Sequence, residues 1–318
     1  MILYDFDAIC VGNAKIDTFL TLSKEDHNLR FIKETNELCI KFGEKITVDK
    51  AELLLGGNAA NVAVGVSRLG LKTALVAEIG TDEFAQKIIN TLSVEGVDTS
   101  NVLQRKGQQS SFSTIINFRK ERTIFSEHVK REHNFNFENI STKWIYLTSI
   151  GNDWEKAYEK TIDFVKSTGS YLAFNPGTLQ IAAGARNLTD VLSLANVFIV
   201  NKQEGKALLK NNSQNIQEVL IGLQKLGPKI VIITDGENGS FAIDEKGNIY
   251  RKAAVETKVV EKTGAGDAYS SGFISAFIKN KPIDEAMKWG SKNSASVINK
   301  VGAQTGLLYK IDLEKNNV

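Results

Sequence analysis

The sequence contains 318 residues, 42% of them hydrophobic and 24% charged, which is typical of a globular protein with a substantial core. Its formal net charge of +2 gives no basis for a nucleic-acid or membrane-binding surface. Its two cysteines, Cys10 and Cys39, do not form a disulfide framework and favour a reducing compartment.

The N-terminal segment predicts no export signal. It carries Asp5 and Asp7 and lacks the basic region with which a signal peptide begins. No apolar run is long enough to cross a membrane, so a cytoplasmic protein is expected. His128 and His133 fall in a charged stretch without metal-ligand spacing, and we predict that both are exposed.

The first predicted strand, Phe6–Gly12, ends at a glycine and leads to Asp17. Asp17 lies in the ragged strand-like stretch NAKIDTFLTL, and it is either a turn acid or an acceptor for a sugar hydroxyl. Two short strands, Leu38–Phe42 and Glu44–Val48, are predicted in the polar stretch that follows. With the predicted hairpin Ser110–Ser126, they indicate a small accessory sheet that covers a site.

The charged stretch EHVKREHNFNF, which follows this hairpin, is expected to be a solvated loop.

A glycine turn and a helix of small residues occupy Leu53–Gly70. Gly56 and Gly57 predict the turn, and the helix is expected over Ala59–Leu69. Asn58 and Asn61 stand three residues apart and therefore on one face of its first turn. Their amides suit sugar hydroxyls, with a plain N-cap as the other interpretation of Asn58.

Strands and helices alternate regularly from Thr73 onward, which predicts a three-layer α/β domain with buried strands. Polar clusters follow the strands, as expected of a site at the carboxyl ends of a parallel sheet. The expected strands are Thr73–Ile79, Trp144–Ile150, Tyr171–Phe174, Val197–Val200, Lys229–Thr234, Ser240–Ile243 and Ile249–Lys252. The expected helices are Asp82–Glu95, Asp153–Ser167, Leu188–Leu194, Lys202–Leu209, Ile216–Leu226, Ala265–Lys279 and Ile283–Lys300.

The segment Lys262–Gly272, KTGAGDAYSSG, is typical either of a capped helix after a glycine loop or of an anion site beside a carboxylate. Its glycines, Gly264 and Gly266, open a helix whose free N–H groups and dipole favour a phosphate. Asp267 in the first turn would repel that phosphate. Its presence is explained if the carboxylate takes a proton from a hydroxyl that attacks the phosphorus.

Taken together, these motifs resemble the PfkB/ribokinase family of carbohydrate and nucleoside kinases over nearly the whole chain. The resemblance rests on GGNAANVAVGVSRLG (Gly56–Gly70), TDGENG (Thr234–Gly239) and KTGAGDAYSSGF (Lys262–Phe273), in the expected order and spacing. Smaller matches are GTDEFA (Gly80–Ala85), NKQE (Asn201–Glu204) and KNSASVINKVGAQ (Lys292–Gln304).

The resemblance implies a single Rossmann-like domain, residues 1–318, whose β-lid is drawn from about 13–50 and 104–130. It implies ATP as the phosphate donor and Mg²⁺ as the cofactor. By position, it implies Asp267 as the catalytic base, Gly264, Ala265 and Gly266 as the anion hole, and Asp17, Gly57, Asn58 and Asn61 as the site for substrate hydroxyls. Asn201 and Glu204 would organise Mg²⁺ through water, and Thr234, Gly236, Gly239 and Asn293 would contact the nucleotide.

Some residues depart from the family pattern. Glu261 and Gly306 stand where K⁺-activated members have an aspartate and often a serine, which weakens the expectation of K⁺ activation. Lys262 adds a positive charge beside the anion hole. Lys15 replaces a neutral residue near Asp17, and the sugar is therefore not specified.

The leading hypothesis is an ATP-dependent kinase that phosphorylates a hydroxyl of a small carbohydrate, like a ribokinase or fructokinase. The alternatives are a nucleoside kinase and a non-catalytic sugar or nucleotide sensor. Arg105, Arg119, Arg122 and Arg131 could bind a phosphosugar, although Arg119 and Arg122 are interpreted as turn charges. Apolar residues on both faces of the strand around Phe118 also predict a homodimer clasped through the lid.

Overall fold

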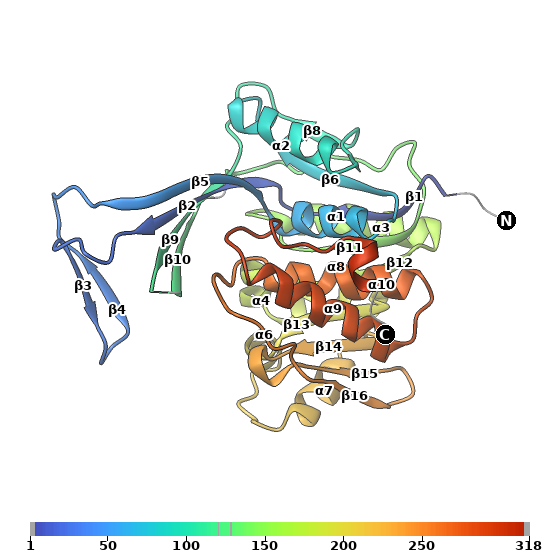
Figure 1. The fold of residues 1–318 in the computed structure, drawn as a ribbon. Helices are drawn as coiled ribbons and strands as arrows, with labels where there is room; N and C mark the ends of the chain where they lie inside the picture. The colour runs from blue at the N-terminus through green and yellow to red at the C-terminus, as the bar shows by residue number, and fades with distance from the viewer. Residues whose placement is uncertain (1–3, 120, 128, 315–318) are drawn as a thin grey trace.

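A computed structural model of the chain describes residues 4–119, 121–127 and 129–314. Within them, the main sheet has 10 strands in the order β16-β15-β14-β13-β12-β11-β1-β6-β7, and β8 also pairs with β6 (Figure 1). All pairs from β14 to β7 are parallel, whereas β15 and β16 are antiparallel additions at one edge. The strands are β1 (Phe6–Val11), β6 (Thr73–Ile79), β7 (Val97–Asp98), β8 (Val102–Gln104), β11 (Thr142–Leu147), β12 (Tyr171–Phe174), β13 (Val197–Asn201), β14 (Ile230–Thr234), β15 (Ser240–Ile243) and β16 (Ile249–Lys252).

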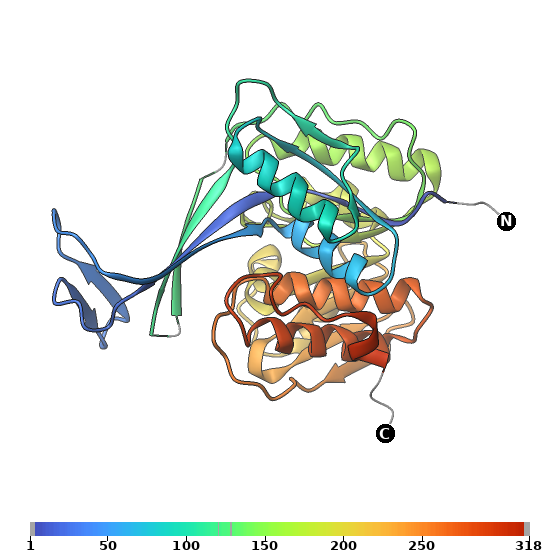
Figure 2. The ribbon, with the colours of Figure 1, turned by 45° about the horizontal axis from the view of Figure 1, so that its top comes forward.

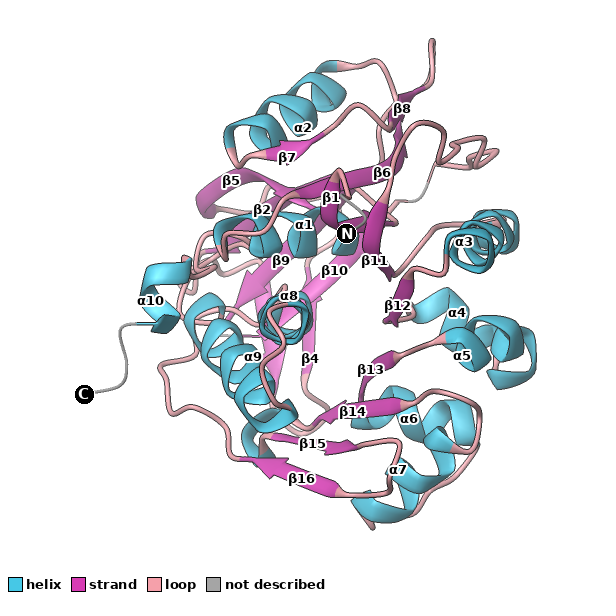
Figure 3. Ribbon diagram, turned by 90° about the vertical axis from the view of Figure 1, so that its right-hand side faces the viewer, coloured by secondary structure: helices cyan, strands magenta, loops and turns pink. Residues whose placement is uncertain are grey.

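Helices cover both faces of this sheet, as Figure 3 shows in a view along it. One face is covered by α1 (Asn58–Arg68), α2 (Glu83–Val94), α8 (Ala265–Ile278), α9 (Ile283–Val297) and α10 (Lys310–Glu314). The other carries α3 (Trp154–Thr168), α4 (Thr178–Ala183), α5 (Thr189–Leu194), α6 (Lys202–Leu209) and α7 (Ile216–Gln224). Short 3₁₀ turns occupy Ala185–Leu188 and Gly236–Asn238.

The central strands are mostly apolar because they contribute side chains to the cores on both faces of the sheet. In β1, Ala8 and Cys10 pack into the core under α1 and α8, whereas Ile9 and Val11 pack into the core under α3 and α5. A strand buried on both faces shows a continuous apolar run instead of alternation. The predicted three-layer α/β fold is therefore confirmed. None of the helices that the structure describes is long and apolar enough to span a membrane.

Several predicted boundaries agree to the residue, and others shift with the length of the partner strand. The segments Tyr171–Phe174, Lys202–Leu209, Ser240–Ile243 and Ile249–Lys252 form as predicted. The strand predicted over Trp144–Ile150 instead ends at Leu147, since the last β1 residue in its ladder, Val11, pairs there.

A second sheet, here called the lid sheet, projects from the carboxyl ends of the main strands (Figures 1 and 2). Its four strands run in the order β10 (Glu121–Ser126), β9 (Phe112–Phe118), β2 (Lys15–Leu22) and β5 (Val48–Gly56). A hairpin of β3 (Leu29–Ile32) and β4 (Glu37–Ile40) stands at its outer end. The predicted hairpin in Ser110–Ser126 is confirmed as β9 and β10.

The strand prediction for Glu44–Val48 is wrong. Residues 44–47 are outside any strand, and β5 begins at Val48, where it pairs with Leu22 at the end of β2. Strand formation needs a partner ladder, and beyond Leu22 the only backbone hydrogen bond that reaches this segment in the described residues runs from the Ser23 N–H to the Thr47 carbonyl at 3.0 Å. Leu38–Phe42 overlaps β4, which pairs with a β3 strand that the sequence analysis did not predict.

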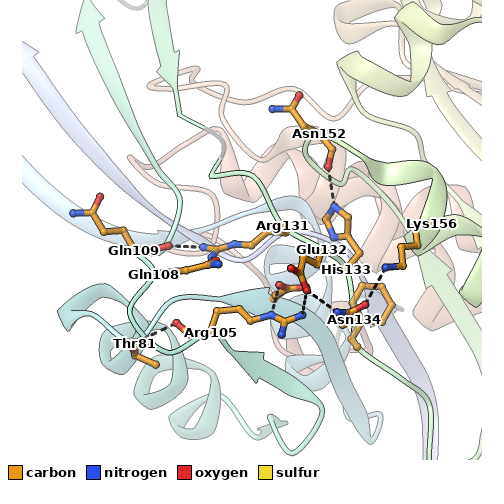
Figure 4. A network of polar contacts seen from close by, with 12 residues as sticks. Thr81, Arg105, Gln108, Gln109, Arg131, Glu132, His133, Asn134, Asn152 and Lys156 are labelled. Atoms are coloured by element: carbon orange, nitrogen blue, oxygen red, sulfur yellow. Dashed lines mark hydrogen bonds and ion pairs between the residues drawn. The ribbon is translucent and has the colours of Figure 1, made fainter.

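The segment after the lid hairpin is a loop, as predicted, but alternate residues of it are buried and not solvated. Arg131, His133 and Phe135 are only 6%, 4% and 4% exposed, whereas Glu132 and Asn134 between them are exposed. Alternate side chains therefore face the body, but the segment is not a regular strand, since His133 has φ of 52°. His133 Nε2 lies 2.8 Å from the Asn152 carbonyl oxygen (Figure 4). The predicted exposure of His133 is thus wrong, and His128 lies outside the described residues.

Arg131 and Arg105 fasten this segment to its neighbours (Figure 4). Arg131 donates to the Gln108 side chain and to the Gln109 carbonyl. The Arg105 Nε donates at 2.6 Å to Glu78, whose side chain is 2% exposed on β6. Both guanidinium groups therefore hold the loop in place, although Arg105 Nη2 and Arg131 Nε have no hydrogen-bond partner among the described residues.

Candidate active site

The N-terminus of α8 is built on a glycine that no other residue could replace without strain. Gly264, the N-cap, has φ of 79°, and a Cβ there would lie 2.4 Å from the Ala303 side chain. The left-handed backbone and this close approach both require glycine. At Gly266, by contrast, a Cβ would meet no atom within 4 Å. The Ala265 N–H donates to the Lys262 carbonyl at 3.3 Å. Because no side chain caps the helix, other N–H groups of its first turn are available to an anion.

Asp267 lies in the first turn of α8, and amide groups from α1 hold it. Asn58 Nδ2 donates to Oδ1 at 3.0 Å and Asn61 Nδ2 donates to Oδ2 at 2.8 Å. Gln304 Nε2 donates in turn to Asn61 Oδ1 at 2.8 Å. Both asparagine amides therefore point at the carboxylate. Asn58 is the first helical residue and Gly57 is the N-cap, so the N-cap interpretation of Asn58 is wrong.

Asp17 comes to the same place from the lid sheet, on β2. Its side chain is 4% exposed, and its Oδ1 has no hydrogen-bond partner among the described residues. A Cβ on Gly56 would fall 2.0 Å from Asp17 Oδ2, which explains why glycine stands there. Gly57 has φ of 92° and lies against the Asn13 backbone. Its role here is to shape the turn. A buried carboxylate oxygen without a partner is costly, so a hydroxyl donor from a ligand would satisfy Asp17.

A cleft of about 300 Å³ opens in front of the α8 N-terminus. Its lining includes Gly264, Ala265, Gly266 and Asp267, together with Asn58, Arg122, Ser149, Asn175, Asn201, Glu204, Thr234 and Lys262. The structure thus brings together residues from α1, α6, α8, the strand ends and the lid sheet. This is the carboxyl end of the parallel strands, where open α/β sheets place their ligands.

Asn201 and Glu204 form a capping box at the start of α6. Asn201 Oδ1 accepts from the Glu204 N–H at 2.9 Å, and Glu204 Oε2 accepts from the Asn201 N–H at 2.9 Å. Burial raises the pKa of Glu204. Within the described residues, no hydrogen bond engages Glu204 Oε1 and no cluster of three or more His, Cys, Asp or Glu side chains could hold a metal. Glu204 therefore fits a magnesium ion held through water, which needs few protein ligands.

A second cavity of about 340 Å³ continues past Gly266 between α8, α9 and the loop after β14. Thr234, Gly236 and Gly239 line it, as do the apolar residues Val255, Val259, Tyr269, Ala295 and Ile298. Ala265 and Gly266 line both cavities. An apolar pocket joined to an anion site by a glycine turn suits a ligand with a flat base and a phosphate chain.

The prediction that Asn293 contacts the nucleotide is not supported by its position. Its side chain is fully buried, with Nδ2 donating to the Ala268 carbonyl and the Ser271 hydroxyl and Oδ1 accepting from the Leu308 N–H. Asn293 therefore ties α9 to α8 and to the C-terminal loop. Its neighbours Ser291 and Ser294 line the cavity instead, because they lie on the face of α9 that turns toward it.

Arg122 lines the cleft, so its interpretation as a turn charge is wrong. It lies on β10, and its Nε is 3.5 Å from Glu261 Oε1 on the loop before α8. Beside it, Lys262 Nζ pairs with Glu121 Oε1 at 2.7 Å. These two ion pairs join the lid sheet to the anion site. The register of β10 opposite β9, which places Arg122 across from Asn117, is what brings it to the cleft.

The raised pKa of Asp267 predicts that any reaction using this carboxylate as a base slows at acid pH. Burial raises the pKa of Asp267 to about 6 and that of Asp17 to about 6. A base acts when ionised, so kcat/KM is expected to rise through pH 6 and level off above it. A steady-state pH profile tests this. A plateau that continues down to pH 4.5 would mean that the essential carboxylate has an ordinary pKa.

Comparison with known proteins matches residues 25–309 to the family model described as pfkB family carbohydrate kinase. The 5-dehydro-2-deoxygluconokinase of Halalkalibacterium halodurans is 28% identical over 315 residues, 93% of this chain and 89% of the relative. A ribokinase of Arabidopsis thaliana, solved with ribose and ATP, superposes with a TM-score of 0.77 at 18% identity over 98% of each chain. An Escherichia coli structure with ATP and Mg²⁺ superposes with a TM-score of 0.78 at 16% sequence identity, over 97% of each chain.

Proposed function

The chain belongs to the pfkB family of carbohydrate kinases, phosphotransferases with a hydroxyl acceptor, and from that premise we propose that it transfers the γ-phosphate of ATP to a small carbohydrate. The observation that carries the proposal is that Asp267 lines the cleft at the open α8 N-terminus, with the buried Asp17 carboxylate near enough for its charge to act on Asp267. Asp17 would accept a hydrogen bond from a sugar hydroxyl. Asp267 would take the proton from the hydroxyl that attacks.

The residues around Asp267 support a role as base. The two asparagine amides hold the carboxylate in one orientation, and Gln304 fixes the amide of Asn61. Burial keeps its basicity above that of an ordinary aspartate. A positioned base of this kind contributes about 10²–10⁴-fold to rate. Little other covalent chemistry is required of the protein, because phosphoryl transfer depends mostly on positioning and charge stabilisation.

The phosphates of ATP would lie over the α8 N-terminus, with the adenine in the apolar cavity beyond Gly266. The N–H groups of Gly264, Ala265 and Gly266 would stabilise charge that develops on the transferred group. Mg²⁺, when bound, would neutralise charge on the phosphate oxygens. Asn201 and Glu204 would hold it through water. Arg122, which lines this cleft from the lid sheet, would add a cation near the phosphates, and closure of the lid would exclude water.

A coupled assay of ATP consumption tests this function against a panel of neutral sugars, sugar acids, phosphosugars and nucleosides. ATP loss that matches phosphorylated sugar, and that stops when EDTA removes Mg²⁺, is the expected result. Turnover with nucleosides alone would replace the proposal with a nucleoside kinase. Binding of ATP and sugar without turnover on any acceptor would indicate a sensor instead.

We also propose that two chains pair through the lid sheet. Phe118 is half-buried, and its ring centroid lies 6.4 Å from that of Phe31. By contrast, Phe42, Ile124 and Phe125 are 102%, 46% and 58% exposed. Apolar side chains on a projecting sheet favour a second copy of the chain. Light scattering at micromolar concentration is expected to give twice the 35.0 kDa chain mass, and Phe125→Asp is expected to lower it. A wild-type mass of one chain would contradict pairing.

A further inference from the structure

Lys15 places an ammonium group beside the two carboxylates of the candidate active site. It is the first residue of β2, and it lies two residues before Asp17 on the same face of that strand. Its charge interacts with Asp17, with Asp267 and with Glu127. The preceding loop is anchored, since the Asn13 N–H donates to the Ser149 carbonyl at 3.0 Å. The position of Lys15 is thus set by the body of the protein as well as by the lid sheet.

The ammonium has donor capacity that the described residues do not use. Its hydrogen bond there goes to Ser126 Oγ at 3.1 Å, and an ammonium has three donors. No carboxylate in the described part of the chain lies within ion-pairing distance of it, although eleven other ion pairs form there. In the neighbouring strand, its partner is Gly56, which has no side chain to cover it. Lys15 therefore does not serve as the close partner of either aspartate.

Lys15 and Asp17 together form a pair of unlike groups at the spacing of a small sugar. Two residues along a strand are about 7 Å apart. Asp17 Oδ1, which has no partner, can accept a hydrogen bond from a ligand. The Lys15 ammonium can donate one to a ligand acceptor. A neutral sugar would satisfy the carboxylate with a hydroxyl but would leave a partly buried cation with only weak acceptors. An anionic oxygen makes the stronger bond to an ammonium.

We propose that Lys15 selects an acceptor sugar that carries an anionic group, either a carboxylate or a phosphate. The inference rests on the proposed function, because it takes Asp17 as the group that binds the acceptor. Asp17 would accept a hydrogen bond from one hydroxyl of the sugar, and Lys15 would bind its anionic group. The hydroxyl that becomes phosphorylated would face Asp267. The anion also offsets the cation that the site would otherwise bury, while the two aspartates disfavour anions that do not reach Lys15.

The test compares each anionic acceptor with its neutral counterpart: D-gluconate with D-glucose, and D-ribose 5-phosphate with D-ribose. In the wild type, kcat/KM is expected to favour one anionic member. Lys15→Met, which keeps the length of the side chain, is expected to lower kcat/KM for that member about 10–100-fold, the effect of one charged hydrogen bond. Neutral acceptors are expected to change less than about 3-fold. The pair that responds identifies carboxylate or phosphate as the anion.

Two further variants distinguish recognition of the anionic group by Lys15 from a general effect of losing a positive charge or of disturbing the structure. Lys15→Arg keeps the charge and is expected to keep the preference for the anion. Lys50→Met, on β5 of the same sheet, removes an exposed lysine whose side chain is 61% accessible, and it is expected to leave the preference unchanged. A wild-type preference for the neutral members would overturn the proposal. So would an equal loss on both members in Lys15→Met, since that result describes a general charge effect.

Calorimetry keeps this inference distinct from the proposed function. Anionic and neutral acceptors are titrated into the wild type and into Lys15→Met with no ATP present. Weaker binding of only the anionic member in the variant supports the inference even if no acceptor is phosphorylated. Turnover of sugars with equal binding of both members would retain the kinase and reject the role of Lys15.

Discussion

Replacement of Asp267 by Asn is expected to lower kcat about 10²–10⁴-fold while ATP and acceptor still bind. Asparagine has nearly the same shape, but its amide cannot accept a proton from the attacking hydroxyl at neutral pH. It can accept a hydrogen bond from only one of Asn58 and Asn61, which both donate to the carboxylate. Steady-state kinetics and calorimetry with both ligands measure the two effects separately.

The control for this variant is Asp190→Asn, an exposed position in the first turn of α5. It removes the same charge away from the cleft, so its kcat is expected to match that of the wild type. Thermal unfolding of all three proteins checks that the fold is retained. If kcat in Asp267→Asn remained within about 3-fold of wild type, far less than a positioned base contributes, another group would have to remove the proton.

Replacement of Gly266 by Val is expected to lower kcat/KM for ATP about 10²-fold, the loss that a displacement of the reacting groups by about 1 Å can cause. A Cβ at this position meets no protein atom within 4 Å, and the residue borders both cavities. The added methyl groups would thus project into the passage where the phosphates would cross from the apolar cavity to the cleft. Because Gly266 lies inside α8 with no positive φ, the backbone tolerates the change.

Gly266→Ala provides the graded control. Alanine adds one methyl group and favours the helix by up to about 1 kcal/mol, so the fold is expected to be at least as stable and the kinetic loss smaller than for Val. Affinity for ATP, measured by calorimetry, is expected to fall in the same order. Equal kinetics for Gly, Ala and Val would show that phosphates do not pass over this residue. Gly264→Val is a poor probe of the same idea, because its side chain would strike Ala303.

The sequence alone predicted features that depend on local chemistry. A glycine turn before a helix, with an acid in its first turn, can be recognised in KTGAGD because the backbone conformation and the residue types are specified within a few positions. Apolar runs predicted the buried strands for the same reason. The accessory hairpin of Ser110–Ser126 was predicted from its two apolar runs and the charged turn between them.

Other features depended on contacts between segments far apart in the chain. The amides of Asn58 and Asn61 turn to a carboxylate that is 209 and 206 residues away, and nothing in the helix that carries them indicates this direction. Asn293 is a buried tie between helices instead of a ligand contact, because the rotation of α9 decides which of its residues line the cavity. His133 is buried because its side chain turns toward the body, where Nε2 lies 2.8 Å from the Asn152 carbonyl oxygen.

The charged residues of the lid sheet also have positions that tertiary contacts decide and that the local sequence does not. The sequence contains Lys15 and Arg122, but neither has a role that its neighbours in sequence can reveal. The parallel pairing of β2 with β9 and the antiparallel pairing of β9 with β10 bring Asp17, Ser113 and Ser126 together. That register places Lys15 beside Ser126 and Arg122 near Glu261. Side-chain identity is a property of the sequence, whereas the partners of a charge are decided by strand register, since a shift of one residue would turn each side chain to the other face.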